Sequence, residues 1–304
     1  MASKQSAAVT RHYQANVAAF AENPQWTLQE SQDFSEGWNV LTTEPGGVDY
    51  LEVSAGGVPA MWAVPKGAQD SRVLLSLHGG GFVGGSMYSH RKLFAHVAKQ
   101  VGARALIVNY RLLPEGRYPA PLDDAYAAYR WLLDQGIEAR HIAFIGDSAG
   151  GTLSIGAQLR ARADGLPLAA ATMLISPWTD MTVTGETMLS NSEKDALFNL
   201  AWVKDLAAGF LDGTDPRNPL ASPLHADLTG FGPVYIQVGD HEMLLDDSRR
   251  FAERAEKAGL DVRIDVFPEM QHTFQMMAGR APEADDAVAR LADWARPRLG
   301  LYDC

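Results

Sequence analysis

The chain has 304 residues and a net charge of −11, from 26 Lys and Arg against 37 Asp and Glu. This length suits one large domain or two small ones, and 46% hydrophobic residues are enough for a sizeable core. The acidic charge argues against a nucleic-acid or anionic membrane partner, since both require clustered Lys and Arg. No apolar run approaches the roughly 18 residues of a membrane span, and the first residues lack the apolar core of a signal peptide. We therefore expect a cytoplasmic globular protein.

The sequence contains one cysteine, Cys304, at its last position. A single cysteine cannot form an intramolecular disulfide, and it argues against a cysteine-rich metal site or thiol catalysis. We accordingly expect no metal ion and no other cofactor.

The first 44 residues are polar with scattered aromatic side chains, and we interpret them as two short helices. Two apolar runs joined by Ser-Ala-Gly-Gly then predict a β-hairpin around residues 48–64.

Beyond the hairpin, short apolar runs alternate with helix-length segments, for example Asp123–Asp134 and Leu244–Ala258. Continuous apolar runs are typical of strands that are buried on both faces of a parallel sheet. The alternation predicts an open α/β sheet. The expected strands are Val73–Leu77, Ala105–Tyr110, Ile142–Ile145, Thr172–Ile175, Val234–Val238 and Val262–Val266.

Residues 181–217 interrupt this alternation, because no strand pattern occurs in them. Phe198, Trp202 and Phe210 recur there at helical spacing, before a turn-forming Asp-Gly-Thr-Asp-Pro. We predict an inserted helical segment, since oversized connections in compact domains are usually functional.

The most specific motif is Gly-Asp-Ser-Ala-Gly at 146–150, directly after an expected strand and before an expected helix. A serine at such a turn must adopt a strained backbone conformation to expose its hydroxyl group. The residues two before and two after it crowd each other, which requires glycine. Ser148 is therefore the candidate nucleophile.

A second motif, His-Gly-Gly-Gly-Phe at 78–82, follows the strand Val73–Leu77. Its glycines bare backbone N–H groups, and two of these with the N–H of Ala149 can bind one oxyanion. A phosphate-binding loop is the weaker alternative, because no Gly-Lys-Ser/Thr follows. We expect His78 to fix this loop by hydrogen bonds.

A serine nucleophile needs a base, and His272 is the candidate because it follows the last expected strand. Active sites of open α/β sheets gather at the carboxyl ends of strands, and the histidine comes last in the order Ser, acid, His. We expect the other candidates to be surface groups or to lie elsewhere: His12, His90, His96, His141 and His225.

The acid should follow the strand Val234–Val238, where Asp240 and Glu242 are both plausible. Asp246 and Asp247 are typical of the first turn of a helix, where the helix dipole favours negative charge.

Together these motifs resemble the bacterial hormone-sensitive-lipase-like esterases, which have the α/β-hydrolase fold. The resemblance runs from about residue 73 to 275, and it includes segments 110–115 and 118–124 and Ser176-Pro177-Trp178. The resemblance implies that Gly80 and Gly81 are the oxyanion donors beside Ala149 and that segment 110–115 braces the loop beneath the site.

The resemblance also bears on the acid. The family usually has Asp in an Asp-Pro-Leu-x-Asp pattern, from which this sequence departs. Counting back four positions from Asp246 selects Glu242, so we favour Glu242 and keep Asp240 as the alternative.

The resemblance further implies a core of residues 45–180 and 218–304, covered by a helical cap of residues 1–44 and 181–217. We expect aromatic residues to line the substrate pocket: Phe34, Trp38, Phe82, Trp178, Phe198 and Trp202. Similar esterases often form homodimers.

The sequence thus predicts a serine carboxylesterase that cleaves short-to-medium acyl esters through an acyl-enzyme. The alternatives are a lactone hydrolase or amidase that uses the same triad, and more remotely a non-catalytic ligand receptor of the same fold.

Overall fold

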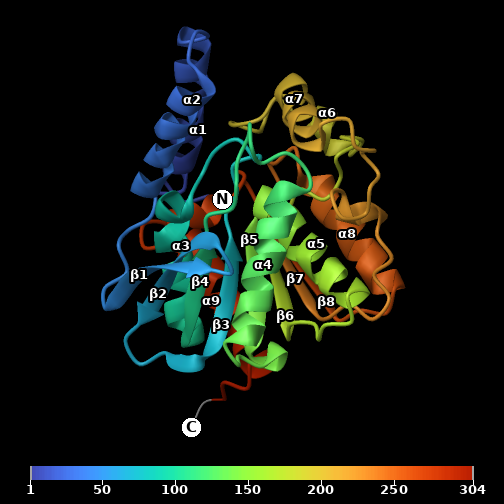
Figure 1. The fold of residues 1–304 in the computed structure, drawn as a ribbon. Coiled ribbons are helices and arrows are strands. Elements are labelled where there is room, and N and C mark those ends of the chain that lie inside the picture. The colour runs from blue at the N-terminus through green and yellow to red at the C-terminus, as the bar shows by residue number, and fades with distance from the viewer. Residues whose placement is uncertain (1, 303–304) are drawn as a thin grey trace.

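An eight-stranded sheet crosses the middle of the protein in the order β1-β2-β4-β3-β5-β6-β7-β8 (Figure 1). The computed structural model describes residues 2–302, so Cys304 lies outside the described residues. The strands β3 to β8 pair in parallel, whereas β2 is antiparallel to both β1 and β4. The strands are β1 (Val48–Ala55), β2 (Val58–Pro65), β3 (Gln69–Leu77), β4 (Ala103–Val108), β5 (Ile142–Asp147), β6 (Ala171–Ile175), β7 (Val234–Gly239) and β8 (Val262–Phe267).

Helices cover both faces of this sheet (Figure 1). The helices α3 and α9 pack on one face, and α4, α5 and α8 pack on the other. The helices are α1 (Ala7–Glu22), α2 (Leu28–Ser35), α3 (Met87–Val101), α4 (Ala120–Asp134), α5 (Ala149–Ala163), α6 (Thr187–Ser190), α7 (Leu200–Leu211), α8 (Leu245–Lys257) and α9 (Pro282–Arg298), with short 3₁₀ turns at Glu36–Val40, Ala139–His141, Pro223–His225 and Phe274–Met277.

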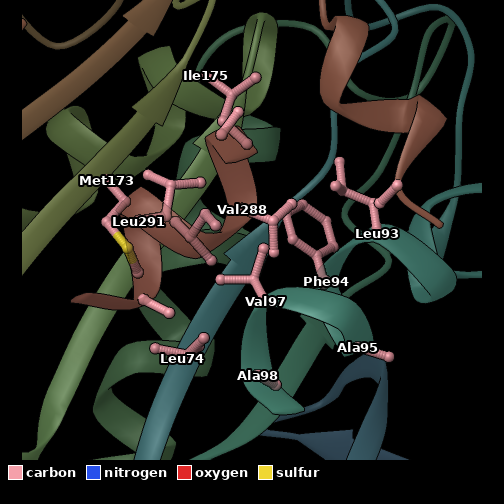
Figure 2. Packing of buried hydrophobic residues seen from close by; sticks show 14 of the residues in the cluster. Leu74, Leu93, Phe94, Ala95, Val97, Ala98, Met173, Ile175, Val288 and Leu291 are labelled. Carbon is pink, nitrogen blue, oxygen red and sulfur yellow. The ribbon is translucent and has the colours of Figure 1, made fainter. Parts of the chain in front are cut away.

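The two faces of the sheet bury alternate residues of the same strands. Leu74 belongs to the cluster with Phe94 of α3 and Val288 of α9, as Figure 2 shows. Its neighbours Val73 and Leu75 belong to the opposite cluster, with α4 and α5. Successive strand side chains point to opposite faces, so a strand covered on both faces must be apolar throughout. This explains the continuous apolar runs in the sequence.

The predicted α/β sheet is confirmed, and each of the six expected strands forms. One strand is displaced by two residues: β4 spans Ala103–Val108, whereas Ala105–Tyr110 was expected. Beyond the end of β4, Tyr110 stacks on His78, with ring centroids 4.2 Å apart. The expected hairpin turns at Gly56 and Gly57 alone, since β1 extends through Ala55.

The two irregular segments of the sequence both lie at the carboxyl ends of the parallel strands. The helices α1 and α2 stand above one part of the sheet, and α6 and α7 stand above another (Figure 1). The ring centroids of Phe20 in α1 and Trp202 in α7 lie 6.4 Å apart, so the two segments are in contact. A reciprocal capping box between Thr27 and Glu30 begins α2.

Within residues 2–302, no helix is long and apolar enough to cross a membrane. Over the same range, no three His, Cys, Asp or Glu side chains converge as metal ligands would.

Candidate active site

Ser148 occupies the sharp turn between β5 and α5. Its φ of 52° lies in the left-handed region, which a side chain other than glycine adopts only under strain. The turn is held on both sides, because the Ser148 amide donates to the Ile175 carbonyl at 2.9 Å and its carbonyl accepts from Gly151. The side chain therefore stands at the N-terminus of α5, where the helix dipole favours a developing negative charge.

The glycines that flank Ser148 are required by close backbone contacts. A Cβ on Gly146 would lie 2.2 Å from the Gly150 carbonyl oxygen, and a Cβ on Gly150 would lie 1.9 Å from the Leu77 oxygen. Backbone atoms cannot yield as a flexible side chain can. The expected crowding is thus present, and it includes β3 as well as the turn itself.

The loop after β3 brings bare backbone beside Ser148. Gly80 and Gly81 line the same cavity as Ser148, and both have positive φ, of 115° and 61°. Among residues 2–302, the N–H groups of Gly80, Gly81 and Ala149 donate to no protein acceptor. Gly80 and Gly81 thus present free donors at the cavity, and the free N–H of Ala149 directly follows Ser148 in the chain.

His78 fixes this loop, as expected. Its Nδ1 lies 2.8 Å from the Gly79 carbonyl, and Tyr110 donates its hydroxyl hydrogen bond to the His78 carbonyl at 2.5 Å. Burial, together with the nearby His90, lowers the pKa of His78 to about 3, so the ring is neutral. Segment 110–115 contacts the loop a second time, through the Leu113 amide and the Phe82 carbonyl.

His272 pairs with Glu242 and not with Asp240. The His272 Nδ1 lies 2.8 Å from Glu242 Oε2, and both side chains are buried. The other oxygen of Glu242, Oε1, accepts from the Ser176 hydroxyl at 2.7 Å and from the Gly239 amide at 2.5 Å. Asp240 instead accepts a bond from the Glu269 amide at 2.6 Å, so it braces the loop that precedes His272.

The electrostatics of the pair favour a charged imidazole. Burial alone lowers the pKa of His272, but the hydrogen bond and charge of Glu242, with smaller contributions from Asp195 and Asp147, outweigh it. The pKa of His272 is therefore raised above its ordinary value.

Two further side chains contact His272. Tyr13 of α1 donates its hydroxyl bond to the His272 carbonyl at 2.9 Å. Phe198 packs edge-on against the imidazole, with ring centroids 4.8 Å apart. Both belong to the two irregular segments, so these segments contact the histidine directly.

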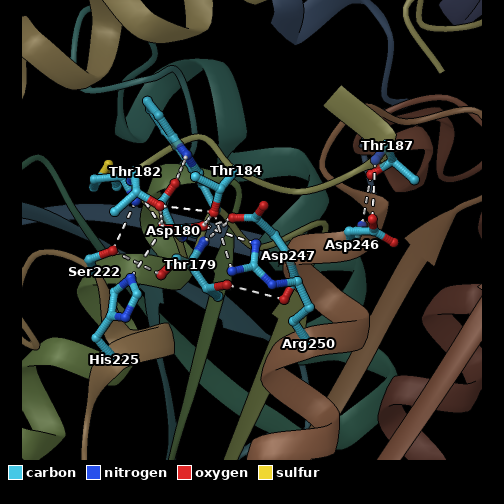
Figure 3. A network of polar contacts seen from close by, with 12 residues as sticks. Thr179, Asp180, Thr182, Thr184, Thr187, Ser222, His225, Asp246, Asp247 and Arg250 are labelled. Carbon is cyan, nitrogen blue, oxygen red and sulfur yellow. Dashed lines mark hydrogen bonds and ion pairs between the residues drawn. The ribbon is translucent and has the colours of Figure 1, made fainter. Parts of the chain in front are cut away.

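A second buried polar cluster fixes the start of α8, just after Glu242 (Figure 3). Asp247 Oδ2 accepts from the amides of Thr179 and Asp180 at 2.8 Å each. Asp180 in turn pairs with Arg250 at 2.9 Å and with His225 at 3.2 Å. Burial, with the charge of Asp180, raises the pKa of Asp247 to about 7. The expectation that Asp246 and Asp247 occupy the first turn of a helix is confirmed.

The expectation for His90 is wrong, because the side chain is buried and not on the surface. His90 faces inward from α3, and its Nε2 lies 3.4 Å from Asp147 Oδ2. The helical spacing with Leu93, Phe94 and Val97 would have indicated this burial. His12 and His96 are half-buried, so they too are less exposed than expected.

A cavity of about 620 Å³ opens onto Ser148 and His272. Its walls are largely apolar and come from α1, α2 and the segment around α7. Four of the expected pocket residues line it: Phe34, Trp38, Phe198 and Trp202.

Two expected pocket residues do not line this cavity. Phe82 is fully buried and stacks on Phe210 with ring centroids 3.7 Å apart, because its positive φ turns the side chain away. Trp178 lines a separate void of about 10 Å³, which also touches Ser148 and Gly81.

Sequence reasoning missed several residues of the site. Tyr13, Val17 and Phe20 line the cavity from one face of α1, and their helical spacing was the available signal. Asp147, within the Gly-Asp-Ser-Ala-Gly motif, accepts from the Gly79 amide at 3.0 Å and so ties the glycine loop to β5. Ser176 lies in a motif that the sequence singled out, but no spacing pointed to its bond with Glu242.

Comparison with known proteins assigns the chain to a family. A family profile described as the α/β-hydrolase fold matches residues 74–276, so the chain belongs to that family. An acetyl-hydrolase of Streptomyces hygroscopicus is 40% identical over 265 residues, 87% of each protein. An ethyl acetate hydrolase of Pseudomonas putida is 33% identical over 236 residues, 74% of this chain and 73% of that protein.

Solved structures give the same result. A crystal structure of an esterase from the bacterial hormone-sensitive lipase family has a TM-score of 0.92 and 40% identity, over 99% of this chain and 100% of that one. The resemblance to bacterial hormone-sensitive-lipase-like esterases is thereby confirmed, and the chain is a hydrolase of carboxylic esters.

The close contacts around Ser148 predict that Gly150→Ala is severely destabilising. The added Cβ meets backbone oxygens that cannot move without shifting β3, which should cost about 3 kcal/mol or more. Chemical denaturation, followed by circular dichroism, measures the change in unfolding free energy. Gly46→Ala is the matched control, because no atom lies within 4 Å of its added Cβ. Equal stability of the two variants would contradict the proposed crowding.

Proposed function

We propose that this chain is a serine carboxylesterase in which Ser148, His272 and Glu242 act as nucleophile, base and acid. The observation that carries the proposal is the buried His272–Glu242 pair, at 2.8 Å, on a cavity shared with Ser148 and unpaired backbone donors. Each part of a serine hydrolase mechanism then has a group suited to it.

In the acylation step, Ser148 Oγ attacks the ester carbonyl carbon while His272 Nε2 takes the hydroxyl proton. Because Nδ1–H is directed at Glu242, Nε2 is the nitrogen left to act as base. The carbonyl oxygen becomes negative and accepts hydrogen bonds from the amides of Gly80, Gly81 and Ala149. The intermediate collapses when His272 returns the proton to the departing alcohol.

Deacylation repeats these steps with water. His272 takes a proton from water, the resulting hydroxide adds to the acyl carbonyl, and Ser148 leaves with the proton that His272 returns. Glu242 accepts the Nδ1–H hydrogen bond and stabilises the imidazolium that forms twice per turnover.

Glu242 is the better candidate acid because of what surrounds it. Two donors, the Ser176 hydroxyl and the Gly239 amide, hold its Oε1 and leave Oε2 for the histidine. Asp240 is exposed to solvent over 39% of its side chain and is occupied by the Glu269 amide.

We also propose that residues 1–44 and 181–217 form a cap over a core of residues 45–180 and 218–304. Support comes from the cavity, whose walls come largely from α1, α2 and the region of α7. Trp26 of this cap lies outside the cavity wall but packs on Phe34, with ring centroids 5.0 Å apart.

The dimensions of the site favour short acyl groups and larger, uncharged alcohols. The departing alcohol must face His272, which lines the 620 Å³ cavity but not the small void. The acyl chain points away from His272, toward the void lined by Val203 and Leu206. A void of about 10 Å³ accommodates roughly one water molecule or methyl group. The acetyl-hydrolase and ethyl acetate hydrolase names of two relatives agree with this assignment, and nothing in them favours lactones.

Ser148→Ala tests the mechanism. We expect kcat for an activated acetate ester to fall by about 10⁴-fold or more, because the acyl-enzyme cannot form. An organophosphate should label Ser148 in the wild type and leave the variant unlabelled, as peptide mass mapping would detect. Near wild-type turnover by the folded variant would refute the serine mechanism.

The identity of the acid is tested by a matched pair of variants. Glu242→Gln should lower kcat by about 10²- to 10⁴-fold, because the imidazolium loses its charged partner. Asp240→Asn should cost less than about tenfold. Steady-state kinetics on both purified variants decides between them, and the reverse order of effects would identify Asp240 as the acid.

Acyl preference is tested at Val203, which lines the small void but not the large cavity. The wild type should prefer acetate over octanoate esters of one alcohol, and Val203→Ala should raise kcat/KM for butyrate relative to acetate by about 3- to 10-fold. Val17→Ala, in the large cavity, is the control and should leave this ratio unchanged. An unchanged ratio in Val203→Ala would mean that the acyl chain lies elsewhere.

A further inference from the structure

A short segment between α6 and α7 contacts both loops that carry the His272–Glu242 pair. We name residues 191–198 the strap. It belongs to the inserted region and ends just before α7, whose side chains line the cavity. Whatever fixes the strap therefore connects the cavity wall with the two loops.

One end of the strap is bonded to the acid loop. Asn191, a buried residue, donates from Nδ2 to the carbonyl oxygens of Asp240 and Glu242, at 3.0 and 2.8 Å. The middle of the strap is bonded to the histidine loop. There Gln271 accepts from the Ala196 amide and donates to the Lys194 carbonyl, at 2.8 Å each.

Asp195 lies where these contacts converge. Its Oδ1 accepts from the amides of Leu197 and Phe198 at 2.9 Å each, and its Oδ2 accepts from the Met243 amide at 2.8 Å. The side chain is only 8% exposed. Three backbone N–H donors around one buried carboxylate stabilise a fixed negative charge.

The contacts of Asp195 reach His272 by two routes. Met243 directly follows Glu242, so the bond to its amide sets the backbone from which the acid extends. Phe198, whose amide Asp195 also holds, packs its ring edge-on against the imidazole at 4.8 Å between centroids.

We propose that Asp195 is a positioning residue for the ester hydrolase reaction, which aligns Glu242 and His272 and adds a further negative charge near the imidazolium. This inference rests on the proposed function, in which His272 acts as the base. Asp195 touches neither the substrate nor the reacting atoms, and it acts through the two residues that it holds.

Three carboxylates act on His272: Glu242, which contacts the ring, Asp195, and Asp147 at the end of β5. Each raises the pKa of His272 against the opposing effect of burial. The uncharged Tyr13 of α1 contacts the His272 backbone. Within the strap itself, Glu193 and Lys194 are exposed to solvent, where their charges are screened.

The sign of the pH effect follows from the role of the base. His272 must be neutral to take the Ser148 proton, so kcat/KM rises with pH through the pKa of His272. Loss of a nearby negative charge destabilises the imidazolium and lowers that pKa. The acidic limb of the profile should then move to lower pH, although the maximal rate falls.

Asp195→Asn is the main test, because it removes the charge and keeps one side-chain acceptor. We expect kcat for an activated acetate ester to fall about 10- to 100-fold with KM changed less than about threefold. The midpoint of the acidic limb of kcat/KM should shift down by about 0.5 to 1 pH unit. Glu193→Gln, an exposed carboxylate of the same strap, is the control and should match the wild type in both quantities.

Asn191→Ala separates alignment from charge. It removes the two bonds to the acid loop and no charge, so kcat should fall about fivefold or more while the midpoint stays in place. This variant also carries the test if Asp195→Asn does not fold, as circular dichroism would reveal.

The experiments distinguish a failure of this inference from a failure of the proposed function. If the wild type neither hydrolyses the ester nor takes the organophosphate label at Ser148, the proposed function itself fails. If the wild type is active and folded Asp195→Asn keeps both its kcat within twofold and its midpoint, the inference is overturned. A lowered kcat with an unmoved midpoint refutes the role of the charge, and a wild-type kcat in Asn191→Ala refutes alignment by the strap.

Discussion

The arrangement of the site depends on how closely β3 approaches the turn that carries Ser148. Without side chains at Gly146 and Gly150, the Leu77 carbonyl and the turn can lie in direct contact. This contact brings the glycine loop that follows β3 next to Ser148, so the proposed nucleophile and the proposed oxyanion donors share one small region. A flexible loop alone could not position the nucleophile and the oxyanion donors, because the donors must be aligned before the reaction begins.

The same region contains several buried carboxylates, and each is bonded to donors that offset the cost of burial. Glu242 has the Ser176 hydroxyl and the Gly239 amide in addition to His272. Asp147 has the Gly79 amide and lies beside His90. Because backbone amides provide many of these donors, the carboxylates also fix the loops from which the amides come. The same hydrogen bonds therefore stabilise the buried carboxylates and fix the conformation of the loops around the site.

Features that depend on local sequence could be predicted, and features that depend on distant contacts could not. The Gly-Asp-Ser-Ala-Gly motif identified the turn because its constraint is steric and lies within five residues. The choice of Glu242 over Asp240 came from counting back four positions from Asp246 in the pattern of the similar esterases, and the structure places Glu242 Oε2 2.8 Å from His272 Nδ1. The direction of Phe82 could not be predicted because it depends on one backbone angle, the positive φ of this residue. The burial of His90 follows from the apolar stripe of α3 beside it, which outweighs the usual exposure of a polar residue. No pattern indicated Asp195, whose partners are backbone amides that any sequence would provide.

The large cavity has a consequence for the fate of the acyl-enzyme. In the proposed mechanism the first product to form is an alcohol, and it forms inside an apolar space of about 620 Å³ bordered by Phe34, Trp202 and other residues of the proposed cap. Water that attacks the acyl group must enter the same space. An alcohol that lingers there competes with water for the acyl carbon and regenerates ester by the reverse reaction. The aromatic walls, by retaining or releasing that alcohol, therefore influence the partition of the acyl-enzyme between hydrolysis and return to the starting ester.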